Sequence, residues 1–286
     1  MFQKIAVLLE MIKFKLTIFA MPFAFMGAFL GARGLPDGLT ILLVILAMVG
    51  ARTCAMGFNR IVDARFDKAN PRTAERAIPA GAVSMIEAWS LVIGAGVLFF
   101  LAAWLLNPLT FKLAPFALSL TLFYSLTKRF TSFCHLILGV ALAFSPLGGW
   151  VAVQGSLSSY PWALSVGVLF WVAGFDTVYA CLDADFDRKS GLHSLPSLLG
   201  QRTAFRLAAG FHVIALSLFA FTGIQANMNF VYFIGVGMAA AALFYQHRLV
   251  NPDDLSKIQG SFFSMNGFIS LALFGATWLA LVTEKL

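Results

Sequence analysis

Nine apolar stretches, each long enough to cross a lipid bilayer as a helix, constrain this chain more than any other feature. The hydrocarbon core of a bilayer is about 30 Å thick, and a helix needs about 20 predominantly apolar residues to cross it. The stretches lie near residues 16–34, 39–60, 83–106, 108–127, 132–153, 161–183, 203–223, 228–247 and 260–283. We therefore predict an all-α, multi-pass membrane protein with about nine transmembrane helices surrounding a central cavity.

The composition leaves no room for a separate soluble domain. Hydrophobic residues make up 60% of the chain and charged residues 12%, whereas soluble domains carry about 25% charged residues. The first stretch follows a basic start but lacks a small-residue cleavage site, so we interpret it as a retained helix and not as a signal peptide. We predict one transmembrane domain spanning residues 1–286.

The distribution of Lys and Arg predicts the topology. With a cytoplasmic N-terminus, only Arg33, Lys112 and Lys285 fall outside and Arg52 lies within a span, which leaves sixteen of the twenty basic residues inside. This matches the positive-inside rule. The net charge of +7 is therefore explained mostly by the membrane topology and does not indicate binding to nucleic acid. We expect a membrane protein whose N-terminus and functional loops are cytoplasmic, with no obligate protein partner.

Two acidic clusters interrupt this apolar chain at predicted cytoplasmic helix ends. The first contains Asn59, Asp63 and Asp67, which fall within an arc of about 80° on a helix. The second lies at Asp183–Asp187, and with Asp176 it forms a helical stripe from which Asp185 points away. Either cluster alone could be a solvated helix end. Carboxylates near a bilayer are costly, however, and two such sets indicate a wet cavity that holds metal ions.

Metal ions and basic residues together would allow this site to bind a diphosphate. Carboxylates cannot hold a diphosphate directly, so Mg²⁺, which prefers oxygen ligands, would bridge the two. The predicted metal ligands are Asn59, Asp63, Asp67, Asp183 and Asp187. Arg and Lys would cover the remaining phosphate oxygens. The predicted substrate-binding cations near the clusters are Arg72, Lys128, Arg129, Arg188 and Lys189.

Two further positions deserve separate hypotheses. Tyr124 and Lys128 share a helix face and are either interfacial anchors or part of the diphosphate site. Arg52 lies seven residues before Asn59, about 10 Å deeper in the membrane, and a cation at that depth needs an anion. Its partner is either Asp176 or the carboxylate of an aromatic acid substrate. His135, His212 and His247 show no partner spacing and receive no role.

These motifs resemble those of the UbiA superfamily of intramembrane prenyltransferases. Its first motif, NDxxDxxxD, matches Asn59, Asp63 and Asp67, and its second, DxxxD, matches Asp183 and Asp187. The YxxxK element matches Tyr124 and Lys128, and the sequence from Asp176 to Ala180 resembles DTxYA. The resemblance covers nearly the whole chain and implies transfer of a polyprenyl group from polyprenyl diphosphate to an aromatic acceptor, with Mg²⁺ as cofactor.

One departure from the motif and one match suggest which acceptor is used. Arg60 stands where the family has its first Asp, which is similar to a bacterial branch near the 4-hydroxybenzoate polyprenyltransferases, and we expect Arg60 to contact phosphate. Arg52 matches the family's Arg for the acceptor carboxylate. The resemblance thus implies 4-hydroxybenzoate as acceptor, with 1,4-dihydroxy-6-naphthoate, in menaquinone biosynthesis, as the alternative. Asp183 is the expected base, with Asp176 stacked beneath it as the second catalytic group.

Other classes fit less well. A secondary transporter would place its charged site near the membrane midplane, whereas these acidic sets cluster at one face. A CDP-alcohol phosphotransferase would need its own Asp-rich signature, which the sequence lacks. A non-catalytic scaffold would not require two metal-binding sets beside basic loops.

Overall fold

Long helices account for most of the chain. The computed structural model describes residues 2–13 and 17–284, where the regular elements are helices apart from an isolated bridge between Asn251 and Asp254. The long helices are α2 (Thr17–Ala32), α3 (Gly38–Ala69), α4 (Met85–Leu106), α5 (Pro108–Thr127), α6 (Cys134–Gln154), α7 (Trp162–Ala180), α10 (Gln201–Gln225), α11 (Phe230–Leu249) and α12 (Ile258–Thr283). The short ones are α1 (Phe2–Met11), the 3-10 turn η2 (Cys181–Asp183), α8 (Ala184–Lys189) and α9 (Leu195–Leu199).

This confirms the predicted multi-pass, all-α architecture of about nine spans. Within the described residues eight helices are long and apolar enough to cross a membrane, and α2 is a shorter apolar helix in the position of the first predicted span. The bounds differ most at α3, which continues to Ala69, nine residues past the predicted end near residue 60. The acidic residues Asp63 and Asp67 are therefore carried on α3 itself and not on a loop.

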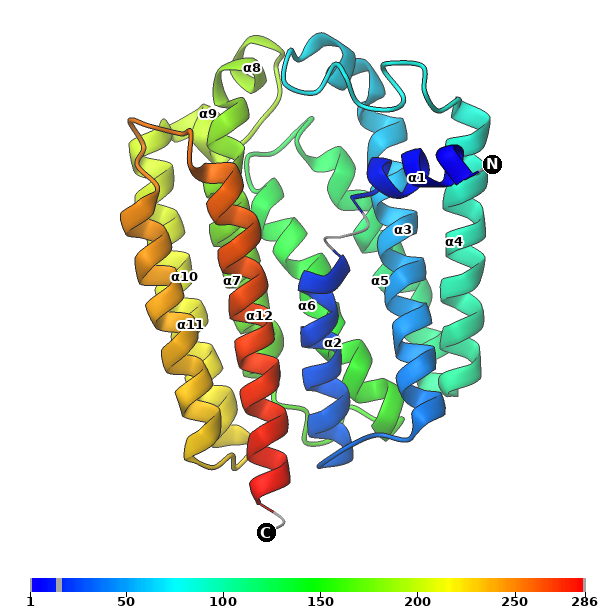
Figure 1. Ribbon diagram of the computed structural model, residues 1–286, viewed down its shortest axis with the longest axis vertical. Helices are drawn as coiled ribbons and strands as arrows, with labels where there is room; N and C mark the ends of the chain where they lie inside the picture. Colours follow the sequence, from blue (N-terminus) through cyan, green and yellow to red (C-terminus); the bar gives the residue numbers. More distant parts are fainter. Residues whose placement is uncertain (1, 14–16, 285–286) are drawn as a thin grey trace.

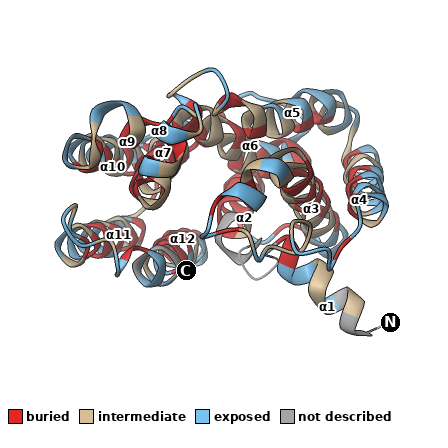
Figure 2. Ribbon diagram, turned by 90° about the horizontal axis from the view of Figure 1, so that it is seen from above, coloured by how far each residue is buried: buried red, intermediate tan, exposed pale blue. Residues whose placement is uncertain are grey.

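The long helices stand side by side and form a closed ring in which chain neighbours pack together and α12 returns to pack on α2 (Figures 1 and 2). Helix α2 also packs on α6, which braces the ring across its middle. Helix α1 lies crosswise beside α3 and the start of α4 (Figure 1), and Lys4 on α1 donates to the carbonyl of Ala82 at 2.8 Å. Lys15 and Lys285, which entered the topology prediction, lie outside the described residues.

Local signals explain where several helices begin. Ser84 and Glu87 form a capping box at the start of α4, in which each side chain bonds the other residue's backbone N–H. Asn107 ends α4 and caps α5, since its Oδ1 accepts the N–H of Thr110 at 2.9 Å. Pro108 follows at the first helical position, where its missing N–H costs nothing.

Glycines allow α2 and α6 to approach closely. A Cβ at Gly149 would overlap the carbonyl oxygen of Ala24, and a Cβ at Gly27 would overlap that of Pro146. Small residues at helix contacts are typical of membrane proteins, because close backbone packing replaces the hydrophobic driving force that lipid cannot supply. Beside this contact Phe23 packs on Trp171, with ring centroids 5.0 Å apart. The close packing of α2 on α6 therefore depends on the absence of a side chain at Gly27 and Gly149.

We expect Gly149→Ala to destabilise the bundle by about 1–3 kcal/mol, because the added methyl must push α2 away from α6. Gly148→Ala is the matched control, since a Cβ there meets nothing within 4 Å. Thermal unfolding in detergent should show a melting temperature several degrees lower for Gly149→Ala alone. Equal melting temperatures for the two variants would contradict the close packing.

Candidate active site

A large cavity of about 960 Å³ connects the α1 end of the bundle to its apolar interior. Its deep part is lined by Phe99, Leu106, Leu113, Phe144 and Leu147, whereas charged residues gather near the mouth. Thr110 and Lys128 both line it and are 18 residues apart along α5, which corresponds to a length of about 27 Å. The cavity is thus a polar mouth on a long apolar chamber.

The first acidic motif lies on one face of α3, as the sequence predicted. Asn59 Nδ2 donates to Asp63 Oδ2 at 2.8 Å, and the other oxygen of Asp63 lies 3.7 Å from the guanidinium of Arg129. Asp67 Oδ1 accepts from Arg76 Nη1 at 2.6 Å, while its Oδ2 is buried without a hydrogen-bond partner. These residues line the cavity, and one buried carboxylate oxygen remains available.

The second acidic motif follows a break in the helix. Arg72 donates to both oxygens of Asp183, and Asn70 Nδ2 donates to Asp183 Oδ1 at 2.9 Å. Asp187, only 1% exposed, has Lys128 Nζ at 3.0 Å from its Oδ1 and 2.8 Å from its Oδ2. Both motifs therefore meet at the mouth, and in this structure cations stand next to their carboxylates.

The two cations on the second motif remain protonated. Burial alone would lower the pKa of Lys128, but the charge of Asp187 and its hydrogen bond outweigh burial and raise that pKa above its ordinary value. Burial likewise lowers the pKa of Arg72, and the hydrogen bonds and charge of Asp183 reverse the effect, so this pKa is also raised. Each carboxylate is thus neutralised by a permanent positive charge that could turn to phosphate.

The predicted continuous stripe of Asp176, Asp183 and Asp187 needs correction. Helix α7 ends at Ala180 and the 3-10 turn η2 follows, so Asp176 and Asp183 do not share one regular α-helix. The three side chains nevertheless line the same cavity. Asp185 points away from it, as predicted, and is 78% exposed.

Arg188 and Lys189 were predicted to bind substrate, but the structure does not bring them to the cavity. Helix α8 turns Asp187 inward, and its neighbours consequently face outward. Arg188 pairs with Asp185 at 3.1 Å and donates to the carbonyl of Ser197 at 3.3 Å. Lys189 is exposed and is not among the lining residues.

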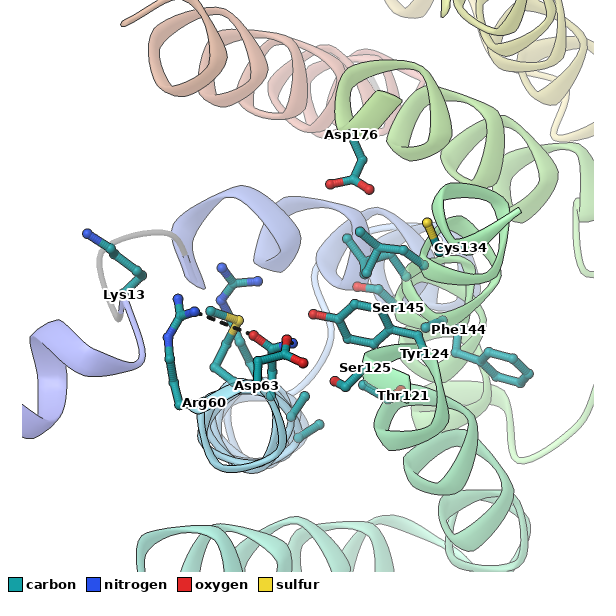
Figure 3. Close-up of a pocket in the computed structure, with 18 of the residues that line it drawn as sticks. Lys13, Arg60, Asp63, Thr121, Tyr124, Ser125, Cys134, Phe144, Ser145 and Asp176 are labelled. Atoms are coloured by element: carbon teal, nitrogen blue, oxygen red, sulfur yellow. Dashed lines mark hydrogen bonds between the residues drawn. The ribbon is translucent and has the colours of Figure 1, made fainter. Parts of the chain in front are cut away.

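Tyr124 and Arg52 also line the cavity. Figure 3 shows Asp63 from α3, Tyr124 from α5 and Asp176 from α7 turned toward one space. The ion pair considered between Arg52 and Asp176 is not formed, because Asp176 Oδ2 instead lies 2.6 Å from His135 Nδ1. Arg52 Nε is buried without a hydrogen-bond partner, and no ion pair with Arg52 is found among the described side chains.

Arg60 has a structural contact that the sequence did not reveal. Its Nε donates to the backbone carbonyl of Met11, the last residue of α1, at 3.1 Å, and its Nη1 lies 3.5 Å from Asn59 Oδ1 (Figure 3). Lys4 holds the other end of α1 through Glu87 on α4, at 2.9 Å. The residue that replaces the motif's first Asp therefore lines the cavity and also fastens α1 across its mouth.

Sequence reasoning missed three polar residues of the site. Arg76 and Asn70 follow the first motif, and the argument that selected Arg72 from the same segment applies equally to Arg76. His135 had no signal, because its partner Asp176 is 41 residues away and on another helix. All three line the cavity.

The donor set fits Mg²⁺, with the ligands divided between two helix ends. Among the described residues no group of three or more His, Cys, Asp or Glu side chains is already gathered as a metal site. The available donors are oxygens, which suit a hard cation, and Asp67 Oδ2 is buried and unpartnered. Asn59, Asp63 and Asp67 on one side and Asp183 and Asp187 on the other could each hold a cation that a diphosphate bridges.

Comparison with known proteins agrees with this geometry. The model of the UbiA prenyltransferase family matches residues 20–272. The chain belongs to the UbiA prenyltransferase family. A 4-hydroxybenzoate octaprenyltransferase from Methylobacillus flagellatus is 31% identical over 248 residues, covering 87% of this chain and 83% of that protein. One from Shewanella denitrificans is 32% identical over 249 residues, covering 87% and 84%.

Solved UbiA structures share the fold. The apo structure of a UbiA homologue from Aeropyrum pernix K1 superimposes with a TM-score of 0.84 at 34% identity, covering 95% of this chain and 98% of that one. A UbiA homologue from Archaeoglobus fulgidus bound to GPP and Mg²⁺ gives a TM-score of 0.76 at 18% identity, covering 96% and 99%. This UbiA family member is thus a multi-pass membrane protein.

Proposed function

We propose that this protein, acting as one transmembrane domain of residues 1–286, transfers a polyprenyl group from polyprenyl diphosphate to 4-hydroxybenzoate in ubiquinone biosynthesis. The observation that carries the proposal is the large cavity, in which two acidic motifs with matched cations open onto an apolar chamber and which follows about 27 Å of α5 from Lys128 to Thr110. Its relatives include proteins named 4-hydroxybenzoate octaprenyltransferases. A long isoprenoid tail needs such a chamber or the lipid beside it.

At the cavity mouth, the acidic residues would bind the metal ions and the basic residues would bind the diphosphate. Bound Mg²⁺ would neutralise the diphosphate and make it a better leaving group, held by the oxygens of Asn59, Asp63, Asp67, Asp183 and Asp187. The cations that now pair with these carboxylates, Arg72, Arg76, Lys128 and Arg129, are placed to cover the remaining phosphate oxygens. The allylic C–O bond would then ionise where charge is best stabilised.

The deeper residues would receive the acceptor. Arg52, with its unpartnered Nε, offers a charge-assisted hydrogen bond to the carboxylate of an aromatic acid. Apolar walls would keep water from the allylic cation until the ring carbon next to the hydroxyl attacks. Tyr124 faces this space, and Asp183 and Asp176 line it at two depths. The products are diphosphate and the prenylated acid.

The distribution of Lys and Arg supports one orientation of the protein in the membrane. We propose that the mouth and the N-terminus face the cytoplasm of a bacterial inner membrane, because this places most Lys and Arg inside. Both substrates' anionic groups would then enter from the cytoplasm, while the prenyl tail stays in the bilayer.

The purified protein in lipid, given a radiolabelled polyprenyl diphosphate, tests the reaction and the acceptor together. We expect a lipid-soluble product with 4-hydroxybenzoate, and loss of product with EDTA that added Mg²⁺ reverses. A parallel reaction contains 1,4-dihydroxy-6-naphthoate, which also carries a carboxylate for Arg52. Product with the naphthoate alone would move the protein to menaquinone biosynthesis, and product with neither acid would refute the proposed acceptor class.

A further inference from the structure

His135 and Asp176 form a hydrogen-bonded pair that the diphosphate chemistry does not use. His135 on α6 is 1% exposed, and its Nδ1 lies 2.6 Å from Asp176 Oδ2. The backbone N–H of Leu195 points to His135 Nε2 at 3.4 Å. Because an N–H can only donate, Nε2 is the accepting nitrogen, and Nδ1 must carry the proton that it shares with Asp176. The imidazole is thus held from both sides in one tautomer.

Asp176 differs from every other aspartate that lines the cavity. Asp63, Asp67, Asp183 and Asp187 each lie next to an Arg or Lys, as an ion pair within 4 Å. In the described part of the chain Asp176 is paired with the imidazole alone. Its side chain is 27% exposed toward the cavity, although His135 behind it is buried. Among the described side chains, Asp176 is thus the cavity aspartate with no Arg or Lys beside it, so it can meet an acceptor hydroxyl without first losing such a cation.

Asp183, the expected base, is poorly suited to take a proton. Arg72 donates to both of its oxygens and Asn70 donates to Oδ1 at 2.9 Å, so three hydrogen bonds from two side chains already hold this carboxylate. Protonation would require breaking these charge-assisted bonds, which are about twice as strong as neutral ones. Asp183 is therefore better fitted to hold metal, and the base is to be sought elsewhere in the cavity.

The depth of Asp176 matches that of the acceptor. Arg52 precedes Asn59 by seven residues on α3, so it lies about 10 Å below the first acidic motif, and Asp176 lies on α7 before the turn η2 that carries Asp183. Asp176 and Arg52 belong to different walls, α7 and α3, and both line the cavity. An aromatic hydroxy acid with its carboxylate on Arg52 can therefore direct its hydroxyl toward the wall that carries Asp176.

We propose that Asp176 takes the hydroxyl proton of the aromatic acceptor and that His135 is the positioning residue that holds Asp176 for this step. This inference rests on the proposed prenyl transfer. As the allylic C–O bond breaks, diphosphate leaves with the electron pair. The acceptor's ring carbon beside the hydroxyl then forms the new C–C bond, and the proton of that hydroxyl passes to Asp176. The resulting dienone loses its ring proton to water, and Asp176 returns its proton to the oxygen, which restores the aromatic phenol.

Two substitutions at His135 separate positioning from packing. His135→Asn keeps an N–H donor near the place of Nδ1, whereas His135→Phe fills the space without a donor. We expect His135→Phe and Asp176→Asn each to lower kcat by about 100-fold or more, the usual size of a general-base contribution. His135→Asn should recover at least tenfold over His135→Phe. His193→Phe, an exposed histidine, is the control and should retain turnover.

Michaelis constants and acceptor acidity provide the decisive readouts. The KM for polyprenyl diphosphate should change by less than about threefold, because the pair lies below the diphosphate site. An acceptor with a more acidic phenol, 3-fluoro-4-hydroxybenzoate, should regain part of the lost kcat in Asp176→Asn and His135→Phe, because it needs less help from a base. A packing defect would slow both acceptors equally, and that result would overturn the inference.

The two proposals fail in different ways. If the wild-type protein prenylates no aromatic acid, the proposed function is wrong. If the wild type is active but Asp176→Asn turns over normally, or if His135→Asn is no better than His135→Phe, the function stands and the assignment of Asp176 and His135 is wrong. Melting temperatures of the variants, measured beside the wild type, identify any that fail to fold.

Discussion

Asp187→Asn should slow prenyl transfer by about a thousandfold, the largest single effect we expect. Asp187 is 1% exposed, lines the cavity mouth and carries the second motif's last carboxylate. The amide keeps its shape but removes the negative charge that would bind Mg²⁺ and also leaves Lys128 without its anion. A thousandfold corresponds to about 4 kcal/mol in the activation free energy, within the several kcal/mol that a metal supplies.

The chain offers a matched control two residues away. Asp185 belongs to the same short helix but is 78% exposed, points away from the cavity and pairs only with Arg188. Asp185→Asn should therefore leave turnover within about twofold of the wild type, because an exposed pair contributes little. Turnover is measured for both variants with Mg²⁺ titrated to saturation. Equal losses in both would mean that the effect reflects the charge of α8 and not a metal ligand.

The ion pairs at the mouth suggest how substrate enters. Without ligand, each motif carboxylate is neutralised by an Arg or Lys, so charge is not left exposed beside the bilayer. On the proposed function, Arg72, Arg76, Lys128 and Arg129 would turn to the diphosphate oxygens, and the carboxylates that they leave would be free to hold Mg²⁺. Every charge then keeps an opposite partner. The exchange would explain why neither metal nor diphosphate needs a preformed, unpaired site.

The sequence predicted those parts of the site that depend on one helix. Asn59, Asp63 and Asp67 recur every four residues, so the helical repeat alone places them on one face of α3. The same reasoning was wrong at Asp176 and Asp183, because the 3-10 turn η2 changes the repeat between them. Lengths of apolar stretches similarly predicted the spans, although they could not locate where α3 ends beyond the membrane.

Contacts between distant segments left no local pattern. His135 meets Asp176 across 41 residues, and Arg60 meets the Met11 carbonyl across 49. Neither residue type nor spacing indicates such a pair, because the partner is selected by how the helices pack. Helix α1 was missed for a related reason, since ten residues are too few for a span and their role depends on Arg60 and Glu87.

Arg52→Met should raise the KM for 4-hydroxybenzoate by about 10- to 100-fold with a smaller change in kcat. Arg52 Nε is buried and unpartnered, and a lost charge-assisted bond to the acceptor carboxylate costs about 1.5–3 kcal/mol. Methionine fills similar space, so the cavity should keep its shape. Binding of polyprenyl diphosphate, which requires the mouth some 10 Å away, should be unaffected.

The acceptor itself supplies the control for this last variant. An ester of 4-hydroxybenzoate lacks the carboxylate charge, so it should react poorly with the wild type and should lose nothing further in Arg52→Met. Steady-state kinetics on both acceptors give the coupling between the arginine and the carboxylate directly. If Arg52→Met weakens acid and ester equally, Arg52 supports the helix packing and the acceptor carboxylate is bound by another residue.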